Sequence, residues 1–154
     1  MTIKRNSEII DMSHEDLVNL FSTALYGSSY LEADYDADFY KSIPKDKRIG
    51  DCFEDKLADV VLNGGQIYFY DNYAEGEVNS TLGEVVDNGE DEPYVMYTIR
   101  LENIIEGLEA CCNKKRGDWE YDCFNDFEND GSGFDLMEAD VLLQNILFLE
   151  TIYG

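Results

Sequence analysis

Residues 94–101 of the chain read YVMYTIRL, a run rich in β-branched and aromatic side chains that is typical of a strand. Directly after this run, apolar side chains recur at the spacing of an amphipathic helix. They are Ile104, Ile105, Leu108, Cys111 and Cys112. Gly107 interrupts the pattern, and a glycine inside a helix costs about 1 kcal/mol relative to alanine. The stretch nevertheless predicts a strand that leads straight into a helix.

The same two kinds of pattern predict the other elements on both sides of this stretch. Ser13 with Asp16 three residues later indicates a capped helix start, and Gly27 indicates its end. Asp135 and Glu138 indicate the start of a C-terminal helix that is apolar nearly all round and therefore belongs in the core. The expected helices lie at residues 13–27, from about 51 to 63, at 104–112, 119–127 and 136–150, and the expected strands at 66–73, 80–86 and 94–101.

The order of these elements predicts the fold class. Strands and helices are mixed without strict alternation, which favours an α+β domain: a small, mainly antiparallel sheet packed with four to five helices on one side. Pro44 and Pro93 are the only prolines, and the twelve glycines are scattered, so the sequence shows no linker or repeat. We therefore expect residues 1–154 to form one domain.

The chain has a large excess of acidic residues. Thirty-four Asp and Glu stand against eleven Lys and Arg, which gives a formal net charge of -23. Disorder does not explain this composition, because 44% of the residues are hydrophobic and 13% are aromatic. The charge disfavours direct binding to nucleic acid, and the patch Lys114-Lys115-Arg116 is too short to overcome it. The composition predicts a folded acidic protein with a basic partner.

The acids concentrate in three segments, residues 32–38, 71–92 and 118–140. The second segment contains no Lys or Arg, and the third is interleaved with aromatic residues. Each segment is a candidate surface for a basic partner, and a homodimer would extend an acidic stripe. The candidate partner-binding residues are Glu32, Asp34, Asp36, Asp38, Glu75, Glu77, Glu90, Asp91, Glu92, Asp122, Asp126, Glu128 and Asp130.

The charge pattern favours mimicry of nucleic acid. Duplex DNA presents one negative charge per roughly 1.7 Å of its axis, and the proteins that hold it line their channels with Lys and Arg. A folded surface with dense carboxylates can occupy such a channel, and neighbouring tyrosines can stack on guanidinium groups. A simpler explanation is that the acids only keep the protein soluble. Two further functions stay open: a sponge for a nucleotide signal, and a structural or assembly protein.

No motif for catalysis or cofactor binding is found. The glycines form neither a dinucleotide-binding nor a phosphate-binding loop, and acidic pairs are expected by chance in so acidic a chain. The cysteines lack the CxxC spacing of a zinc site, so we expect four reduced thiols. The single histidine, His14, is expected to be exposed in the first turn of its helix. We therefore expect neither an enzyme nor a cofactor.

Residues 126–133, DFENDGSG, can be aligned with a calcium-binding loop. Asp126, Glu128 and Asp130 then take positions one, three and five. The match fails at position twelve, where Met137 replaces the bidentate glutamate. We therefore expect no metal site here, and a loop that leads into a capped helix.

Three segments of the chain carry a resemblance to known proteins. They are residues 51–65, residues 97–101 leading into 104–108, and residues 143–154. Together they resemble small acidic proteins of unassigned function that are encoded by bacteriophages and integrated mobile elements of gut bacteria. The resemblance implies a setting in the host cytoplasm, where the partner would be a nucleic-acid-binding protein of host defence. The sequence also shows no signal peptide and no membrane-spanning run, so no membrane association is expected.

Overall fold

The strand predicted at residues 94–101 lies inside the four-stranded sheet but is shorter than predicted, ending at Ile99, because Leu101 already begins the next helix. This strand, β6 (Tyr94–Ile99), lies between β4 (Ile67–Asp71) and β5 (Gly83–Val86), and β3 (Leu31–Tyr35) is the edge strand on the far side of β4. All three pairings are antiparallel. The strand order β3-β4-β6-β5 leaves β3 and β5 as the two edges.

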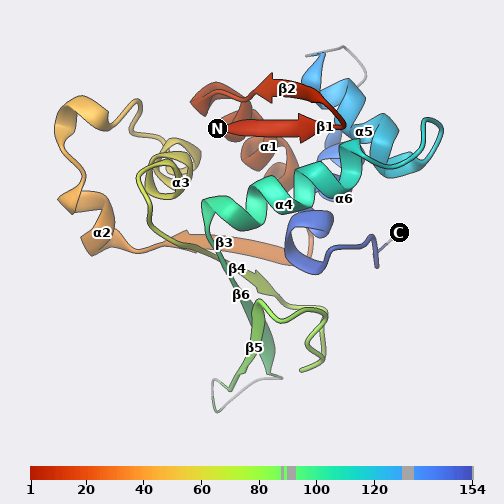
Figure 1. Ribbon diagram of the computed structural model, residues 1–154. Coiled ribbons are helices and arrows are strands. Elements are labelled where there is room, and N and C mark those ends of the chain that lie inside the picture. Colours follow the sequence, from red (N-terminus) through yellow and green to blue (C-terminus); the bar gives the residue numbers. More distant parts are fainter. Residues whose placement is uncertain (88, 90–92, 130–133, 154) are drawn as a thin grey trace.

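The computed structural model describes residues 1–87, 89, 93–129 and 134–153. In this part of the chain, six α-helices accompany the sheet and a separate two-stranded hairpin (Figure 1). The predicted α+β class is confirmed. The remaining elements are β1 (Thr2–Arg5), β2 (Glu8–Asp11), α1 (His14–Tyr26), α2 (Ala37–Ser42), a 3-10 turn (Lys45–Lys47), α3 (Phe53–Leu62), α4 (Leu101–Cys112), α5 (Trp119–Glu128) and α6 (Leu136–Phe148).

The helices cover one face of the sheet, as predicted. Along β4 and β6, alternate side chains are fully buried against the helices: Ile67 and Phe69 in β4, and Val95, Tyr97 and Ile99 in β6. The side chains between them are partly exposed on the opposite face. Figure 1 shows the helices on one side of the sheet, with β5 at the bottom of the view, farthest from them.

Hydrogen bonds at the helix starts confirm two of the predicted caps. The N–H of Ser13 donates to Asp16 Oδ2 at 2.7 Å, and the N–H of Asp16 donates to Ser13 Oγ at 3.2 Å, which is the reciprocal capping box. At α6 the N–H of Glu138 donates to Asp135 Oδ1 at 2.9 Å. These side chains satisfy backbone groups that have no partner within the helix.

The helical core is built around α6, which packs against α1, α4 and α5. Nine consecutive or nearly consecutive side chains of α6 are buried, as its all-round apolar pattern predicted. Gly107 of α4 lies directly against α6, because a Cβ atom there would come within 2.6 Å of the Ile146 Cα atom. The interruption in the helix pattern is therefore a point of close approach between two helix backbones.

The sequence patterns did not predict the β1–β2 hairpin, β3 or α2. The hairpin packs on α4, where the N–H of Lys4 donates to Glu109 Oε1 at 3.0 Å and the N–H of Asn6 donates to Asn113 Oδ1 at 2.7 Å. Its strands are four residues long, too short for a periodic pattern to stand out. Among the described residues, the structure has no helix with the length and apolar character needed to cross a membrane.

Candidate functional site

The face of the sheet that points away from the helices combines acids with tyrosines. Side chains alternate across a sheet, so the residues between the buried ones all lie on this face. We call this surface the outer face. Its residues are Glu32 and Asp34 of β3, Tyr68 and Tyr70 of β4, Glu84 and Val86 of β5, and Tyr94, Met96 and Thr98 of β6.

The strand register places an acid at each end of one row across the outer face. This row runs from Glu32 through Tyr70 and Met96 to Glu84. Glu32 and Glu84 are exposed, whereas Tyr70 and Met96 are half-buried. The row therefore has an aromatic and apolar centre with a carboxylate on each edge strand.

The tyrosines of the outer face are held in place by one another and by neighbouring polar groups. The rings of Tyr70 and Tyr94 meet edge to face, with centroids 5.4 Å apart. The hydroxyl of Tyr68 accepts a hydrogen bond from Gln66 Nε2 at 2.8 Å, and Gln66 Oε1 accepts one from Arg100 Nη2 at 3.0 Å. The aromatic part of this surface is thus largely fixed before any partner binds.

The electrostatic character of the outer face is negative. Asp34 is exposed, and no ion pair among the described residues involves Glu32, Asp34 or Glu84. Burial, followed by the charge of Asp34, raises the pKa of Tyr70, so its hydroxyl stays protonated at neutral pH. The surface therefore offers unpaired carboxylates beside hydroxyl donors and aromatic faces.

Of the first predicted segment, Glu32 and Asp34 form part of the outer face, and the other two acids lie beyond the strand. Asp36 accepts a hydrogen bond from the N–H of Phe39 at 3.0 Å and so caps α2. Asp38 is exposed in the first turn of that helix. Asp36 thus has a structural role as a helix cap, unlike Glu32 and Asp34.

The second segment is only partly a surface. Glu75 and Glu77 are exposed in the connection between β4 and β5. Glu90, Asp91 and Glu92 lie outside the described residues. The first acid of the segment, Asp71, is fully buried, so the expectation of an acidic surface is wrong at this residue. Its carboxylate is used inside the fold, as a hydrogen-bond acceptor for Tyr73 N–H and the Tyr153 hydroxyl.

The third segment is divided between surface and core. Asp122 is exposed on α5, whereas Glu128 forms an ion pair with Arg5, with its Oε2 atom 2.6 Å from Nη2. The interleaved aromatic residues Phe124 and Phe127 are buried, so their spacing reflects an amphipathic helix and not an aromatic surface. Asp130 lies outside the described residues.

Glu84 lies in the predicted segment 71–92 but was not among the named candidate residues, and the tyrosines of the outer face were not predicted as part of a site. A usable signal exists in residues 31–35, LEADY, because apolar and acidic side chains alternate there with the period of a strand. The high charge of the segment conceals this alternation. Pairing β3 with β4 would have placed its acids beside Tyr68 and Tyr70.

The calcium-loop alignment does not fit the fold. Asp126 and Glu128, its first and third positions, lie in the last turns of α5 and not in a loop. Residues 130–133 of the alignment lie outside the described part of the chain. Within the part that is described, no group of three or more His, Cys, Asp or Glu residues could hold a metal ion.

The carboxyl group of Asp126 in α5 instead lies close to that of Glu138 in α6. Burial, then a hydrogen bond to Asp126 and the charge of that residue, raise the pKa of Glu138 from 4.5 to about 7. The Glu138 carboxyl group therefore holds its proton more tightly in the folded protein than in the unfolded chain. The resulting stabilisation is fully present below about pH 4.5 and is lost as the pH rises through about 7.

Replacing Glu138 by glutamine should remove this pH dependence. We expect Glu138→Gln to melt at nearly the same temperature as the wild type at pH 5, and at a higher temperature at pH 7.5, because the glutamine stays neutral. Asp122→Asn, which removes an exposed charge from α5, is the control for general relief of repulsion. A difference between Glu138→Gln and the wild type that is the same at both pH values would contradict the raised pKa of Glu138.

His14 lies at the edge of the core and three of the four cysteines lie in it, whereas Cys52 is exposed. The expectation of an exposed His14 is wrong: its side chain is 9% exposed, and Nε2 lies 3.1 Å from Oδ1 of Asp59, a buried residue of α3. This burial arises because α3 packs against α1. Burial raises the pKa of the Cys111 and Cys123 thiols to about 12, so these thiols are protonated at neutral pH and unsuited to nucleophilic attack.

Comparison of the chain with protein-family models, with curated proteins and with solved structures found no significant match. The resemblance to acidic proteins of phages and mobile elements therefore stays a prediction. Function is inferred below from the residues of the chain and from their arrangement.

Proposed function

We propose that the protein is an acidic binding protein that occupies a basic, nucleic-acid-binding surface of another protein, in the predicted setting a host defence protein. The observation that carries this proposal is the outer face, where Glu32, Asp34 and Glu84 surround fixed tyrosines and have no cationic partner among the described residues. The mechanism is steric and electrostatic, and the protein performs no chemical step.

The chemistry of the outer face suits arginine and lysine side chains. A carboxylate accepts two parallel hydrogen bonds from a guanidinium group, and the faces of Tyr70 and Tyr94 attract cations. Because the rings are already packed together, little side-chain entropy is lost on binding. The net charge of -23 adds a long-range attraction that accelerates the encounter with a basic protein and weakens as salt rises.

A nucleotide sponge receives less support. An anionic phosphate needs cationic or backbone N–H donors, whereas a cavity between α1 and α6 is lined by Asp140 and, among its described residues, by no Lys, Arg or His. A pocket lined by Arg100 is also lined by the acidic residue Asp36. The outer face also presents carboxylates to solvent. The charges of these surfaces therefore favour a basic protein partner over a nucleotide.

The proposal is tested by capture followed by competition. The wild-type protein is immobilised and exposed to a bacterial lysate from which nucleic acid has been removed by nuclease, at low and moderate salt. Each captured protein is then purified and bound to a fluorescent DNA or RNA duplex, and the acidic protein is added as a competitor. We expect displacement of the duplex, with an inhibition constant that rises steeply with salt.

Matched triple variants locate the binding surface. Glu32→Gln, Asp34→Asn and Glu84→Gln together should weaken the competition by about 3- to 150-fold, since each exposed ion pair contributes roughly 0.2–1 kcal/mol. The control triple neutralises three exposed acids elsewhere, by Glu8→Gln, Asp11→Asn and Glu15→Gln, and changes the net charge equally. Equal effects of the two triples, or captured proteins that keep their duplex, would refute the proposal.

A further inference from the structure

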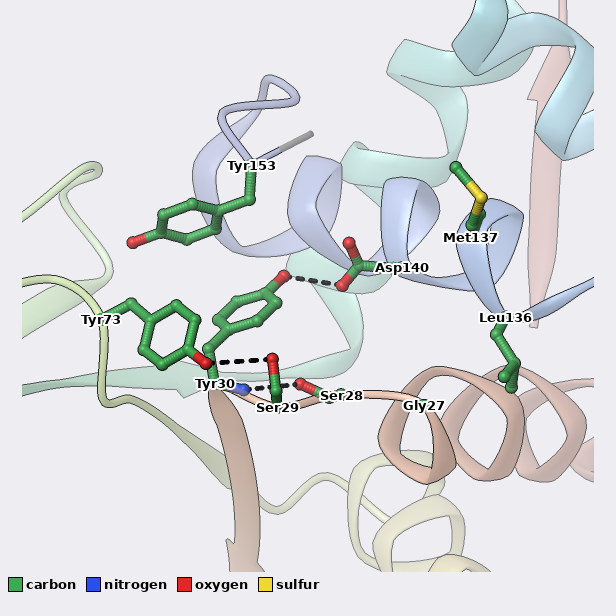
Figure 2. Close-up of a pocket in the computed structure, with 9 residues that line it drawn as sticks. All are labelled: Gly27, Ser28, Ser29, Tyr30, Tyr73, Leu136, Met137, Asp140 and Tyr153. Atoms are coloured by element: carbon green, nitrogen blue, oxygen red, sulfur yellow. Dashed lines mark hydrogen bonds between the residues drawn. The ribbon is translucent and has the colours of Figure 1, made fainter.

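A cavity of about 340 Å³ opens between the end of α1 and the first half of α6 (Figure 2). The turn after α1, the segment after β4 and the C-terminal segment complete its walls. Its volume lies in the lower part of the range for small-molecule sites, about 300–1,000 Å³. The cavity shares no residue with the outer face, so a ligand bound there does not depend on the proposed function.

One wall of the cavity is aromatic. The ring centroid of Tyr30 lies 4.7 Å from that of Tyr153 and 5.7 Å from that of Tyr73, and Figure 2 shows the three side chains grouped together. The hydroxyl of Tyr73 donates to Ser29 Oγ at 3.1 Å, which holds this ring although it is 55% exposed. The faces of these rings attract cations.

A carboxylate stands beside the aromatic wall. Asp140 Oδ1 accepts a hydrogen bond from the Tyr30 hydroxyl at 2.6 Å, and Oδ2 accepts one from Gln144 Nε2 at 2.7 Å. Both donors are neutral, so the negative charge is not compensated. A carboxylate can accept about four hydrogen bonds, which leaves acceptor capacity on both oxygens of Asp140.

A second carboxylate lies behind the aromatic wall. Asp71 is fully buried and accepts hydrogen bonds from the Tyr153 hydroxyl at 2.8 Å and from the Tyr73 N–H at 2.9 Å. Burial and these carboxylates raise the pKa of both Tyr30 and Tyr153, so the hydroxyls remain neutral donors. Among the described residues that line the cavity, none is Lys, Arg or His.

The rim of the cavity on α6 is apolar. Leu136 is 42% exposed and Met137 is 63% exposed, and both line the cavity (Figure 2). Methionine is flexible and polarizable, and it adapts to ligands of irregular shape. An alkyl chain that lies against these two side chains would direct its end toward Asp140.

We propose that this cavity binds an organic cation, a protonated amine or a guanidinium group carried on a short alkyl chain. The charged group lies against the Asp140 carboxylate and the tyrosine rings, and the alkyl chain lies against Leu136 and Met137. Such a ligand supplies both elements that the cavity lacks: a positive charge and an apolar partner for the exposed rim.

The ligand class is tested by titration of the full chain in low salt, followed by two-dimensional NMR of the backbone amides. The probes are n-butylguanidinium and n-butylammonium, with 1-butanol as the neutral control and butanoate as the anionic one. We expect the cations to bind with a dissociation constant of about 0.1–10 mM and to shift the amides of Ser28, Ser29 and Asp140. Equal binding of 1-butanol, or no binding of either cation at about 50 mM, would overturn the proposal.

Two substitutions that each add one positive charge test whether the cation binds in this cavity. Met137→Lys puts an ammonium group one helical turn from Asp140, where it competes with the ligand, and should weaken binding by the cations at least tenfold. Tyr26→Lys, at a position 87% exposed and outside the cavity, should leave the affinity unchanged. Both positions are exposed, so both variants should fold. Equal affinities in the two variants would refute the site.

Two further probes distinguish the sources of the cation. N-acetyl-arginine amide and N-acetyl-lysine amide represent the side chains of a partner protein, and butane-1,4-diamine represents a free metabolite. Tenfold tighter binding of the capped amino acids assigns the cavity to a protein partner, and tenfold tighter binding of the diamine assigns it to a free amine. Failure of all three to shift the cavity amides would count against the proposal.

Discussion

Replacing Gly107 by alanine is expected to lower the free energy of unfolding by about 2 kcal/mol, although the same change in an exposed helix raises it by about 0.5–1 kcal/mol. The added Cβ atom would meet two backbone atoms of α6, the Ile146 Cα at 2.6 Å and the Asn145 carbonyl oxygen at 2.9 Å. Backbone atoms cannot move aside as a flexible side chain does. Helices α4 and α6 must therefore separate, and their buried contacts weaken.

Urea denaturation of the Gly107→Ala variant measures this effect. Glu106→Ala is the matched control, because Glu106 is the neighbouring residue on the exposed side of α4 and should change the stability by no more than about 0.5 kcal/mol. A Gly107→Ala variant as stable as the wild type, or more stable, would show that α4 and α6 adjust without cost.

Replacing Gln144 by leucine should cost about 2–4 kcal/mol, although the change makes α6 more apolar. Gln144 is fully buried and uses its whole hydrogen-bonding capacity. Its Oε1 accepts from the N–H groups of Ile152 and Tyr153 at 2.8 and 2.9 Å, and its Nε2 donates to Asp140 Oδ2 and to the Tyr153 carbonyl. Leucine removes the partner of all four groups, and a fully buried unsatisfied group costs about 1–3 kcal/mol. Because Asp140, Ile152 and Tyr153 are partly exposed, water replaces part of the loss, so the total stays below the full sum.

The loss should appear as release of the C-terminal segment. We expect Gln144→Leu to lower the urea midpoint and to make the last residues sensitive to carboxypeptidase at a concentration that leaves the wild type intact. Gln66→Leu is the control, because that side chain makes its two hydrogen bonds at a half-buried position that water can reach. Similar losses in the two variants would contradict the special role of Gln144.

Periodic patterns predicted the long elements well, because the spacing of core side chains and the helix caps both depend on residues that are close together in the sequence. The helices α1, α3, α4, α5 and α6 and the strands β4, β5 and β6 lie within the expected ranges to within a few residues. The β1–β2 hairpin escaped prediction because its stability depends on α4, about a hundred residues away in the sequence. A pattern confined to four-residue strands contains no information about that partner.

The meaning of individual residues depended on contacts between distant elements. In the sequence, Gly107 only interrupts a helix pattern, whereas in the structure it allows α6 to pack closely on α4. Asp71 was expected at the surface, but it is buried and accepts a hydrogen bond from the Tyr153 hydroxyl. The net charge did predict an acidic surface in general terms. The outer face required the register of β3 on β4, which combines residues 31–35 with residues 67–71 and is not contained in either segment alone.

The packing of α1 on α6 has a consequence for the growing chain on the ribosome. Helix α1 ends at Tyr26, and α6 begins only at Leu136, so the part of α1 that packs on α6 stays uncovered while about 110 further residues are made, even though α3 can pack against α1 earlier. At synthesis rates of about 5–20 residues per second, this delay lasts roughly ten seconds. During it, the many acids of the unfinished chain repel other nascent chains and protect the exposed helix from aggregation. This expected effect of the charge on the unfinished chain is separate from the binding role proposed for the folded protein.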